Sequence, residues 1–74
     1  MIDKIKIAER IKALRCQSKY SQQYIADRLY ISQPAYSLLE TGKNYLVLDH
    51  IARLSEIYRR TTDFLILGSE RQQD

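Results

Sequence analysis

The sequence predicts an all-α domain of five helices, built around a helix-turn-helix between residues 21 and 42. Two short segments there carry apolar residues at helical rather than strand spacing. Each segment begins just after a serine, Ser21 or Ser32, whose side chain can cap a helix by accepting a hydrogen bond from a backbone N–H. A corner at Tyr30 and Ile31 joins the two segments, and Gly42 follows the second in the position of a C′ glycine.

The length and composition limit the possible classes of protein. The 74 residues make one domain, with a core over about residues 5–68 and a polar tail over 69–74. The net charge of +3 permits a nucleic-acid partner without requiring one. The single cysteine excludes an internal disulfide framework and fits a reducing cytoplasm. Charges interrupt residues 1–15 and no apolar run is long enough to span a bilayer, so neither a signal peptide nor a membrane partner is predicted.

Helical spacing of apolar residues predicts one helix before the central pair and two after it. The fourth helix has a poorly defined start, because Val47 stands where a capping serine or threonine is expected. The fifth is short and is capped by Thr61 or Thr62. The five helices are predicted over about residues 5–17, 22–29, 33–41, 48–58 and 63–67.

The fifth predicted helix carries more apolar surface than one small core can absorb. Residues 64–67 are all apolar and cannot all face the same core, so part of the run is expected at an interface. We expect Leu65 to face the core. Phe64 and Leu67 lie three residues apart on one helical face and are expected to form a symmetric homodimer interface. The alternative is that the whole run closes the core of a monomer.

The stretch from Ser21 onward reads S-Q-x-x-I-A-x-x-L and then I-S-Q-x-x-Y-S-x-L-E-x-G-K. This pattern resembles the phage Cro and lambda-repressor family of XRE-type helix-turn-helix DNA-binding domains, and the resemblance covers about residues 7–68. It implies a compact five-helix lambda-repressor-like fold. It also implies a small prokaryotic or phage transcriptional regulator, most often a repressor, that binds specific sequences of double-stranded DNA in the cytoplasm.

The third predicted helix has an uncharged outer face that can lie in the major groove of DNA. The amide of Gln33 can hydrogen-bond an adenine edge in bidentate fashion, and Leu38 can touch a thymine methyl group. Ser32 and Ser37 can each reach a base or a phosphate. The expected base-contacting residues are therefore Ser32, Gln33, Ser37 and Leu38. The alternative is a solvated amphipathic face, in which Leu38 belongs to a protein interface.

Phosphate contacts are expected from residues outside this face. Gln22 opens the second predicted helix, where free backbone N–H groups and the helix dipole favour an anion. In the family, the loop after the third helix follows the sugar-phosphate backbone. Arg15 and Glu40 match a pair with which the family locks the first helix onto the third, and Arg15 can then offer an N–H to a phosphate. The expected phosphate-contacting residues are Gln22, Arg15, Lys43, Asn44 and Tyr45.

The sequence departs from the family pattern at three positions, and two of them, Tyr30 and Leu38, support a rival function together with the uncharged reading helix. Tyr30 stands where the family has glycine, so the corner is either strained or built differently. Pro34 removes one possible base-reading side chain, and Leu38 occupies a position that is often polar or basic in the family. The rival is a protein-interaction or antitoxin-like module that uses the same fold with weak or no DNA binding.

No residue pattern indicates catalysis or a bound metal ion. His50 and Cys16 are the only strong nitrogen or sulfur ligands, and two residues cannot make a four-ligand zinc site. Cys16 is expected to be a small filler at the end of the first helix, and His50 a surface residue. No serine has a histidine and an acid available to activate it. We therefore predict no enzyme, no cofactor and no metal.

Overall fold

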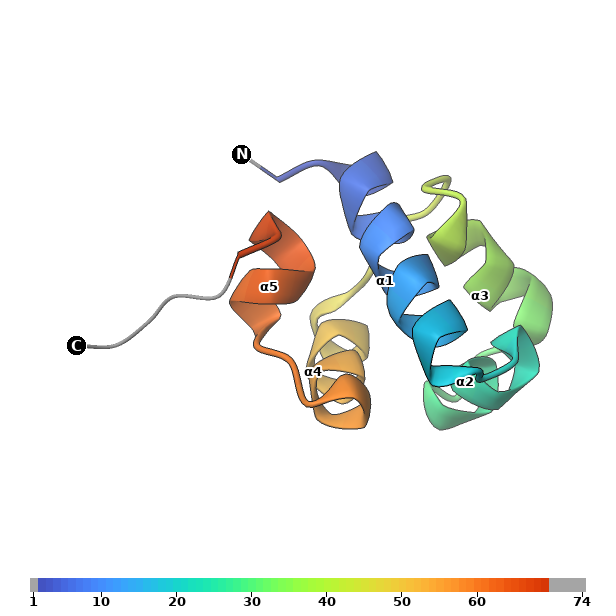
Figure 1. Cartoon of the computed structure of the whole chain (residues 1–74). Helices are drawn as coiled ribbons and strands as arrows, with labels where there is room; N and C mark the ends of the chain where they lie inside the picture. The colour runs from blue at the N-terminus through green and yellow to red at the C-terminus, as the bar shows by residue number, and fades with distance from the viewer. Residues whose placement is uncertain (1, 70–74) are drawn as a thin grey trace.

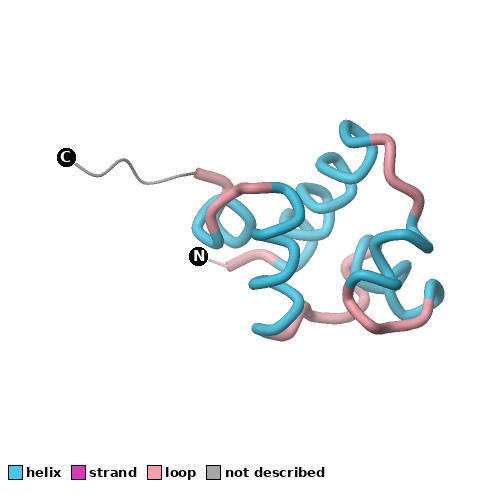
Figure 2. Tube along the Cα trace, turned by 90° about the horizontal axis from the view of Figure 1, so that it is seen from below, coloured by secondary structure: helices cyan, strands magenta, loops and turns pink. Residues whose placement is uncertain are grey.

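The computed structural model describes residues 2–69, which fold into helices joined by short loops, with no strand among these residues (Figures 1 and 2). The helices begin and end within one or two residues of the ranges predicted from apolar spacing. They are α1 (Lys4–Ser18), α2 (Gln22–Arg28), α3 (Gln33–Glu40), α4 (Leu48–Tyr58) and α5 (Thr62–Leu67). None of them is long and apolar enough to cross a membrane.

Helix α1 occupies the middle of the molecule, with α2 and α3 on one side and α4 and α5 on the other (Figure 1). It packs against α3 and α5, while α2 packs on α3 and α4 packs on α5. Apolar side chains from all five helices meet between them. The buried apolar residues are Ile7, Ala8, Ile11, Leu14, Ile25, Ala26, Leu29, Tyr36, Leu39, Leu54 and Leu65. Cys16 is exposed, so the expectation of a core filler was wrong.

Side-chain caps fix the start of four helices. The predicted caps form at α2, where Ser21 accepts from the N–H of Tyr24, and at α3, where Ser32 accepts from Ala35. At α5 the cap is Thr61 rather than Thr62. Asp3 caps α1 by accepting from two backbone N–H groups, a cap that the sequence reasoning missed. Val47 makes no side-chain cap bond, as its side chain predicts.

The corner of the helix-turn-helix keeps the backbone conformation that suits glycine, although a tyrosine stands there. Tyr30 has φ 60°, in the left-handed region. The residue is 78% exposed, and the guanidinium of Arg53 lies over its ring, 4.7 Å from the ring centroid. The sequence left open whether the corner is strained or built differently, and the structure shows the strained form. A non-glycine residue in this region costs about 1–2 kcal/mol.

Gly42 closes α3 as predicted, with φ 76° two residues after the helix ends. It is also buried against α1, because a Cβ at this position would lie 2.5 Å from Cδ1 of Ile5. The glycine therefore serves both the turn and the contact between the α3–α4 loop and α1.

Arg10 ties the last helix to the first. Its Nη1 donates to the backbone carbonyls of Leu65 and Ile66 at 3.0 and 3.1 Å, near the C-terminal end of α5 where carbonyls lack helical partners. Leu65 is buried, as predicted, and Leu67 is 49% exposed. Phe64 is half-buried, packs against the core and holds the guanidinium of Arg60 at 3.6 Å from its ring centroid.

The strained corner predicts that glycine at position 30 stabilises the domain relative to alanine. We expect Tyr30→Gly to be about 1 kcal/mol more stable than Tyr30→Ala, because only glycine adopts positive φ without a Cβ clash. Both variants lose the ring over which Arg53 lies, so alanine is the matched control. Urea denaturation followed by circular dichroism gives the comparison. Equal stability of the two variants would mean that position 30 is not left-handed in solution.

Candidate nucleic-acid interface

The outer face of α3 has the character that the sequence predicted. Tyr36 and Leu39 are buried on the inner side. Leu38 is 39% exposed in the middle of the outer face. Gln33 and Ser37 are half-buried beside it, and Ser32, Pro34 and Thr41 are exposed. The face therefore offers hydroxyl, amide and methyl groups without a formal charge.

Two amides that the sequence assigned to different tasks lie in direct contact. Nε2 of Gln33, expected to read a base, donates to Oε1 of Gln22 at 2.7 Å. Gln22, expected to contact a phosphate, also donates from its own Nε2 to Oε1 of Glu40 at 3.0 Å. Both glutamines are the first residues of their helices, so the two helix starts converge at this point.

Glu40 is the buried acceptor at the end of this chain of hydrogen bonds. The residue is 6% exposed and accepts from three side chains. Arg15 donates through Nε to Oε2 at 2.6 Å and through its Nη2 to Oε1 at 3.1 Å. The hydroxyl of Tyr36 donates to Oε2 at 2.5 Å, and the third donor is Gln22. The expected pairing of Arg15 with Glu40 is confirmed, and it locks α1 onto α3.

These contacts fix the charge states of the cluster. Burial raises the pKa of the Glu40 carboxyl, but hydrogen bonds from Arg15, Tyr36 and Gln22 outweigh burial, so that the pKa is lowered overall. Burial, and then the bond to Glu40, raises the pKa of the Tyr36 hydroxyl. The hydrogen bond to Glu40 raises the pKa of Arg15. At neutral pH Glu40 is therefore an anion that only accepts, while both partners remain donors.

Arg15 is held more firmly than the sequence implied. Besides the bonds to Glu40, its Nη1 donates to the backbone carbonyl of Tyr20 at 3.0 Å. Its side chain is 14% exposed. The guanidinium retains donor capacity after these three bonds, because it carries five N–H groups. The predicted contact between Arg15 and a phosphate stays a prediction.

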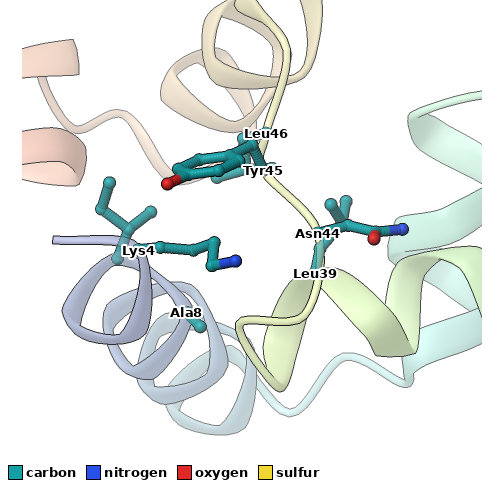
Figure 3. A pocket seen from close by; sticks show the side chains of 7 residues that line it. Lys4, Ala8, Leu39, Asn44, Tyr45 and Leu46 are labelled. Carbon is teal, nitrogen blue, oxygen red and sulfur yellow. The ribbon is translucent and has the colours of Figure 1, made fainter.

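The loop between α3 and α4 exposes the three remaining candidate phosphate contacts, Lys43, Asn44 and Tyr45. The backbone N–H groups of Lys43 and Asn44 both donate to the carbonyl of Leu38, which holds the loop against the end of α3. Figure 3 shows Lys4, from the start of α1, reaching toward the loop that carries Asn44 and Tyr45. Its Nζ lies 4.6 Å from the centroid of the Tyr45 ring.

The sequence reasoning missed Lys4 and the bonds of Gln22 to Gln33 and Glu40. Helical spacing places residues on a face of their own helix, but it says nothing about a neighbouring helix. The one available signal was that Gln22 and Gln33 each directly follow a capping serine. Within residues 2–69 no group of histidine, cysteine, aspartate or glutamate could hold a metal ion.

Known proteins match both the sequence and the fold. Residues 11–65 match a family model described as Helix-turn-helix. The chain is 41% identical over 66 residues to YonR, an SPbeta prophage-derived uncharacterized HTH-type transcriptional regulator of Bacillus subtilis (strain 168), covering 89% of this chain and 61% of YonR. It is 32% identical over 62 residues to the HTH-type transcriptional activator BcrR of Enterococcus faecalis, covering 84% of this chain and 30% of BcrR. The chain therefore spans less than two thirds of each relative's length.

A solved structure confirms the fold class. The P22 c2 repressor protein, crystallised in complex with a synthetic operator, matches with a TM-score of 0.78 and 25% identity. The match covers 85% of this chain and 96% of that chain. The five-helix lambda-repressor-like fold predicted from the sequence is therefore the fold of this chain.

The buried carboxylate predicts an acid-dependent stability. The folded-state pKa of Glu40 lies below the reference value of 4.5, so its contribution to the free energy of unfolding is present above about that pH. The contribution is lost as the pH falls through the lower folded-state pKa. We expect the stability difference between the wild type and Glu40→Gln to narrow as the pH is lowered from about 7 to about 3. Urea denaturation at each pH measures the difference in the free energy of unfolding. Glu9→Gln, at an exposed site on α1, controls for the change in net charge.

Proposed function

Because the chain belongs to the helix-turn-helix family, we propose that it is a transcriptional regulator that binds specific sequences of double-stranded DNA. One observation carries the proposal: the outer face of α3 is uncharged and faces away from the core, and candidate phosphate donors adjoin it at Gln22, which bonds to Gln33, and in the exposed loop after α3. A major groove is wide enough for such a helix. The operator-bound P22 c2 repressor, which has the same fold, supports the same partner.

Base reading is assigned to α3. After donating to Gln22, the amide of Gln33 keeps one N–H, which can donate to N7 of adenine, and its Oε1, which can accept from the N6 amino group. Leu38 offers methyl groups to thymine, and Ser32 and Ser37 offer hydroxyls. Since α3 carries no lysine or arginine, DNA shape contributes the rest of the sequence preference.

Phosphate contacts are assigned to two groups of residues. Gln22 and Arg15, which both bond to Glu40, form the first group, and the exposed loop of residues 43–45 after α3 forms the second. Lys4 extends the second group, because its ammonium is close to the Tyr45 ring. These groups bind backbone phosphates of any sequence, and so they fix the position of α3 in the groove without selecting bases.

The regulatory outcome that we propose is repression, in which the bound protein blocks polymerase. The names of similar proteins differ here, because P22 c2 is a repressor and BcrR a transcriptional activator. Transcription from a template that carries the selected site is measured with and without the protein. A decrease indicates repression and an increase indicates activation. A cytoplasmic location follows from the DNA partner. The expectation that the chain is not an enzyme agrees with the family, and the expectation that it needs no cofactor stays a prediction.

We propose that the protein binds DNA as a homodimer. One domain reads only a few base pairs, and two-fold pairing places the two reading helices about 34 Å apart, one turn of DNA. An apolar pocket of about 290 Å³ opens between α1, α4 and α5, and we infer that the partner protomer covers it. Leu48, which lines the pocket, is 83% exposed. Leu67, which follows the lining residue Ile66 on α5, is 49% exposed, whereas Phe64 is half-buried in its own protomer. The pocket is lined by Ile2, Ile7, Tyr45, Leu46, Leu48, Ile51 and Ile66.

The first test concerns Gln33 as a base reader. Gln33→Ala is expected to reduce binding to a selected site by about 1–3 kcal/mol and to relax the preference at one position per half-site. Selection of bound duplexes from a random pool, for wild type and variant, gives both quantities. Equal losses on selected and random DNA would assign Gln33 to the backbone instead.

The second test concerns Lys43 as a phosphate contact. Lys43→Ala should weaken binding to every duplex and lower the slope of log affinity against log salt by about one unit. Lys19→Ala, at the exposed end of α1 remote from the loop in sequence, is the control for net charge. If the wild type does not bind random duplex DNA at any salt concentration, the rival function as a protein-interaction module is favoured.

The third test concerns the dimer. Leu67→Glu is expected to give a folded monomer at micromolar concentration, because a carboxylate cannot be buried unpaired at a two-fold interface. Sedimentation measures the oligomeric state, with Leu38→Glu as the control, since Leu38 is exposed on α3, on the opposite side of α1 from α5 (Figure 1). A wild type that stays monomeric and binds a palindrome no better than a half-site would contradict the homodimer.

A further inference from the structure

A continuous chain of hydrogen bonds connects the buried carboxylate to the outer face of α3. It runs from Oε1 of Glu40 to Nε2 of Gln22 at 3.0 Å, and from Oε1 of Gln22 to Nε2 of Gln33 at 2.7 Å. Glu40 is 6% exposed, whereas Gln33 lies on the face that we assign to DNA. The chain therefore links the core to the side chain that is proposed to read a base.

The donor and acceptor at each step of this chain of hydrogen bonds follow from the chemistry of Glu40, at its buried end. An ionised carboxylate only accepts hydrogen bonds, so Gln22 must turn its NH₂ group toward Glu40. The carbonyl of Gln22 then faces Gln33, and Gln33 must in turn present its NH₂ group to Gln22. Each amide alone could turn over and exchange oxygen for nitrogen, but the carboxylate makes only one of the two orientations satisfy every bond.

Glu40 is well suited to fix this orientation. Arg15 and Tyr36 also donate to it, which favours its charged form. The hydrogen bond from Gln22 shares Oε1 with Nη2 of Arg15. The carboxylate is therefore held by two donors besides Gln22.

We propose that Glu40 is a positioning residue that fixes, through Gln22, the orientation of the Gln33 amide oxygen and nitrogen toward a base. The fixed orientation lets the protein distinguish A·T from T·A at one position. The proposal rests on the proposed function. An adenine edge offers the N6 donor and the N7 acceptor in a fixed order along the major groove, and exchanging the bases of the pair changes that order relative to the protein. An amide held in one orientation matches one order, whereas an amide free to turn over accommodates both.

The experiment compares two operators that differ only by A·T or T·A at the position whose preference depends on Gln33. The affinity ratio between them is measured for the wild type, Glu40→Gln, Gln22→Met and the double variant. Glu40→Gln keeps the shape but supplies an NH₂ group, so both directions of the chain become possible. Gln22→Met removes the link and leaves the bonds of Glu40 to Arg15 and Tyr36 in place.

We expect the wild type to discriminate about tenfold or more, as a bidentate contact does, and each single variant to discriminate about threefold or less. In the Gln22→Met background, Glu40→Gln should change the ratio no further, because the chain is already broken. Gln23→Met is the matched control: Gln23 neighbours Gln22 but bonds to Asp27, so the ratio should stay at the wild-type value.

Several results would overturn the proposal, and they differ from failure of the proposed function. Glu40 acts on the fold alone if Glu40→Gln weakens binding to both operators equally. The same conclusion holds if Glu40→Gln lowers the affinity ratio in the Gln22→Met background as much as it does in the wild type. If Glu40→Gln does not fold by circular dichroism, Gln22→Met alone decides, and an unchanged ratio refutes the proposal. A wild type that binds no duplex refutes the proposed function. A ratio unaffected by Gln33→Ala refutes the base contact on which the proposal rests.

Discussion

The buried carboxylate of Glu40 is the constraint on which the rest of this small domain depends. An isolated charge in the interior is destabilising by several kcal/mol, so it persists only where donors surround it. Here those donors come from three helices, with Arg15 on α1, Gln22 on α2 and Tyr36 on α3. The requirement to satisfy one carboxylate therefore sets the relative positions of the three helices that form the candidate DNA surface.

The second half of the domain is attached in a different way. Arg10 on α1 donates to carbonyls at the end of α5, and Leu54 and Leu65 fill the core between α1 and the C-terminal pair. Hydrogen bonds from Arg15 and Arg10 thus join α1 to α3 and to α5, while buried apolar side chains fill the space between the helices. Because α1 packs against both α3 and α5, it connects the candidate DNA face with the apolar pocket beside α5. The homodimer that we propose would use this connection to keep its two reading helices in register with the DNA.

The backbone shows where this chain departs from ideal turn chemistry. Lys19, Tyr30 and Arg59 all have positive φ, a region that favours glycine. At position 30 an aromatic ring covered on one side by Arg53 takes the place of glycine. A domain of this size has little stability to spare, so three such residues are a sizeable burden. Glycine is retained at position 42, where φ is 76° and a Cβ would lie 2.5 Å from the tip of the Ile5 side chain.

The sequence by itself determined the helices, their order and the fold class, because apolar spacing, serine caps and Gly42 are local signals that act within a few residues. It also singled out Gln33, Gln22 and the Arg15–Glu40 pair. Tertiary structure alone decided that Gln22 joins Glu40 to Gln33, that Lys4 meets Tyr45, and that Phe64 packs inward while Leu48 and Leu67 are exposed. Those outcomes depend on how helices distant in sequence are placed, and a periodic pattern carries no information about the neighbour that a face will meet.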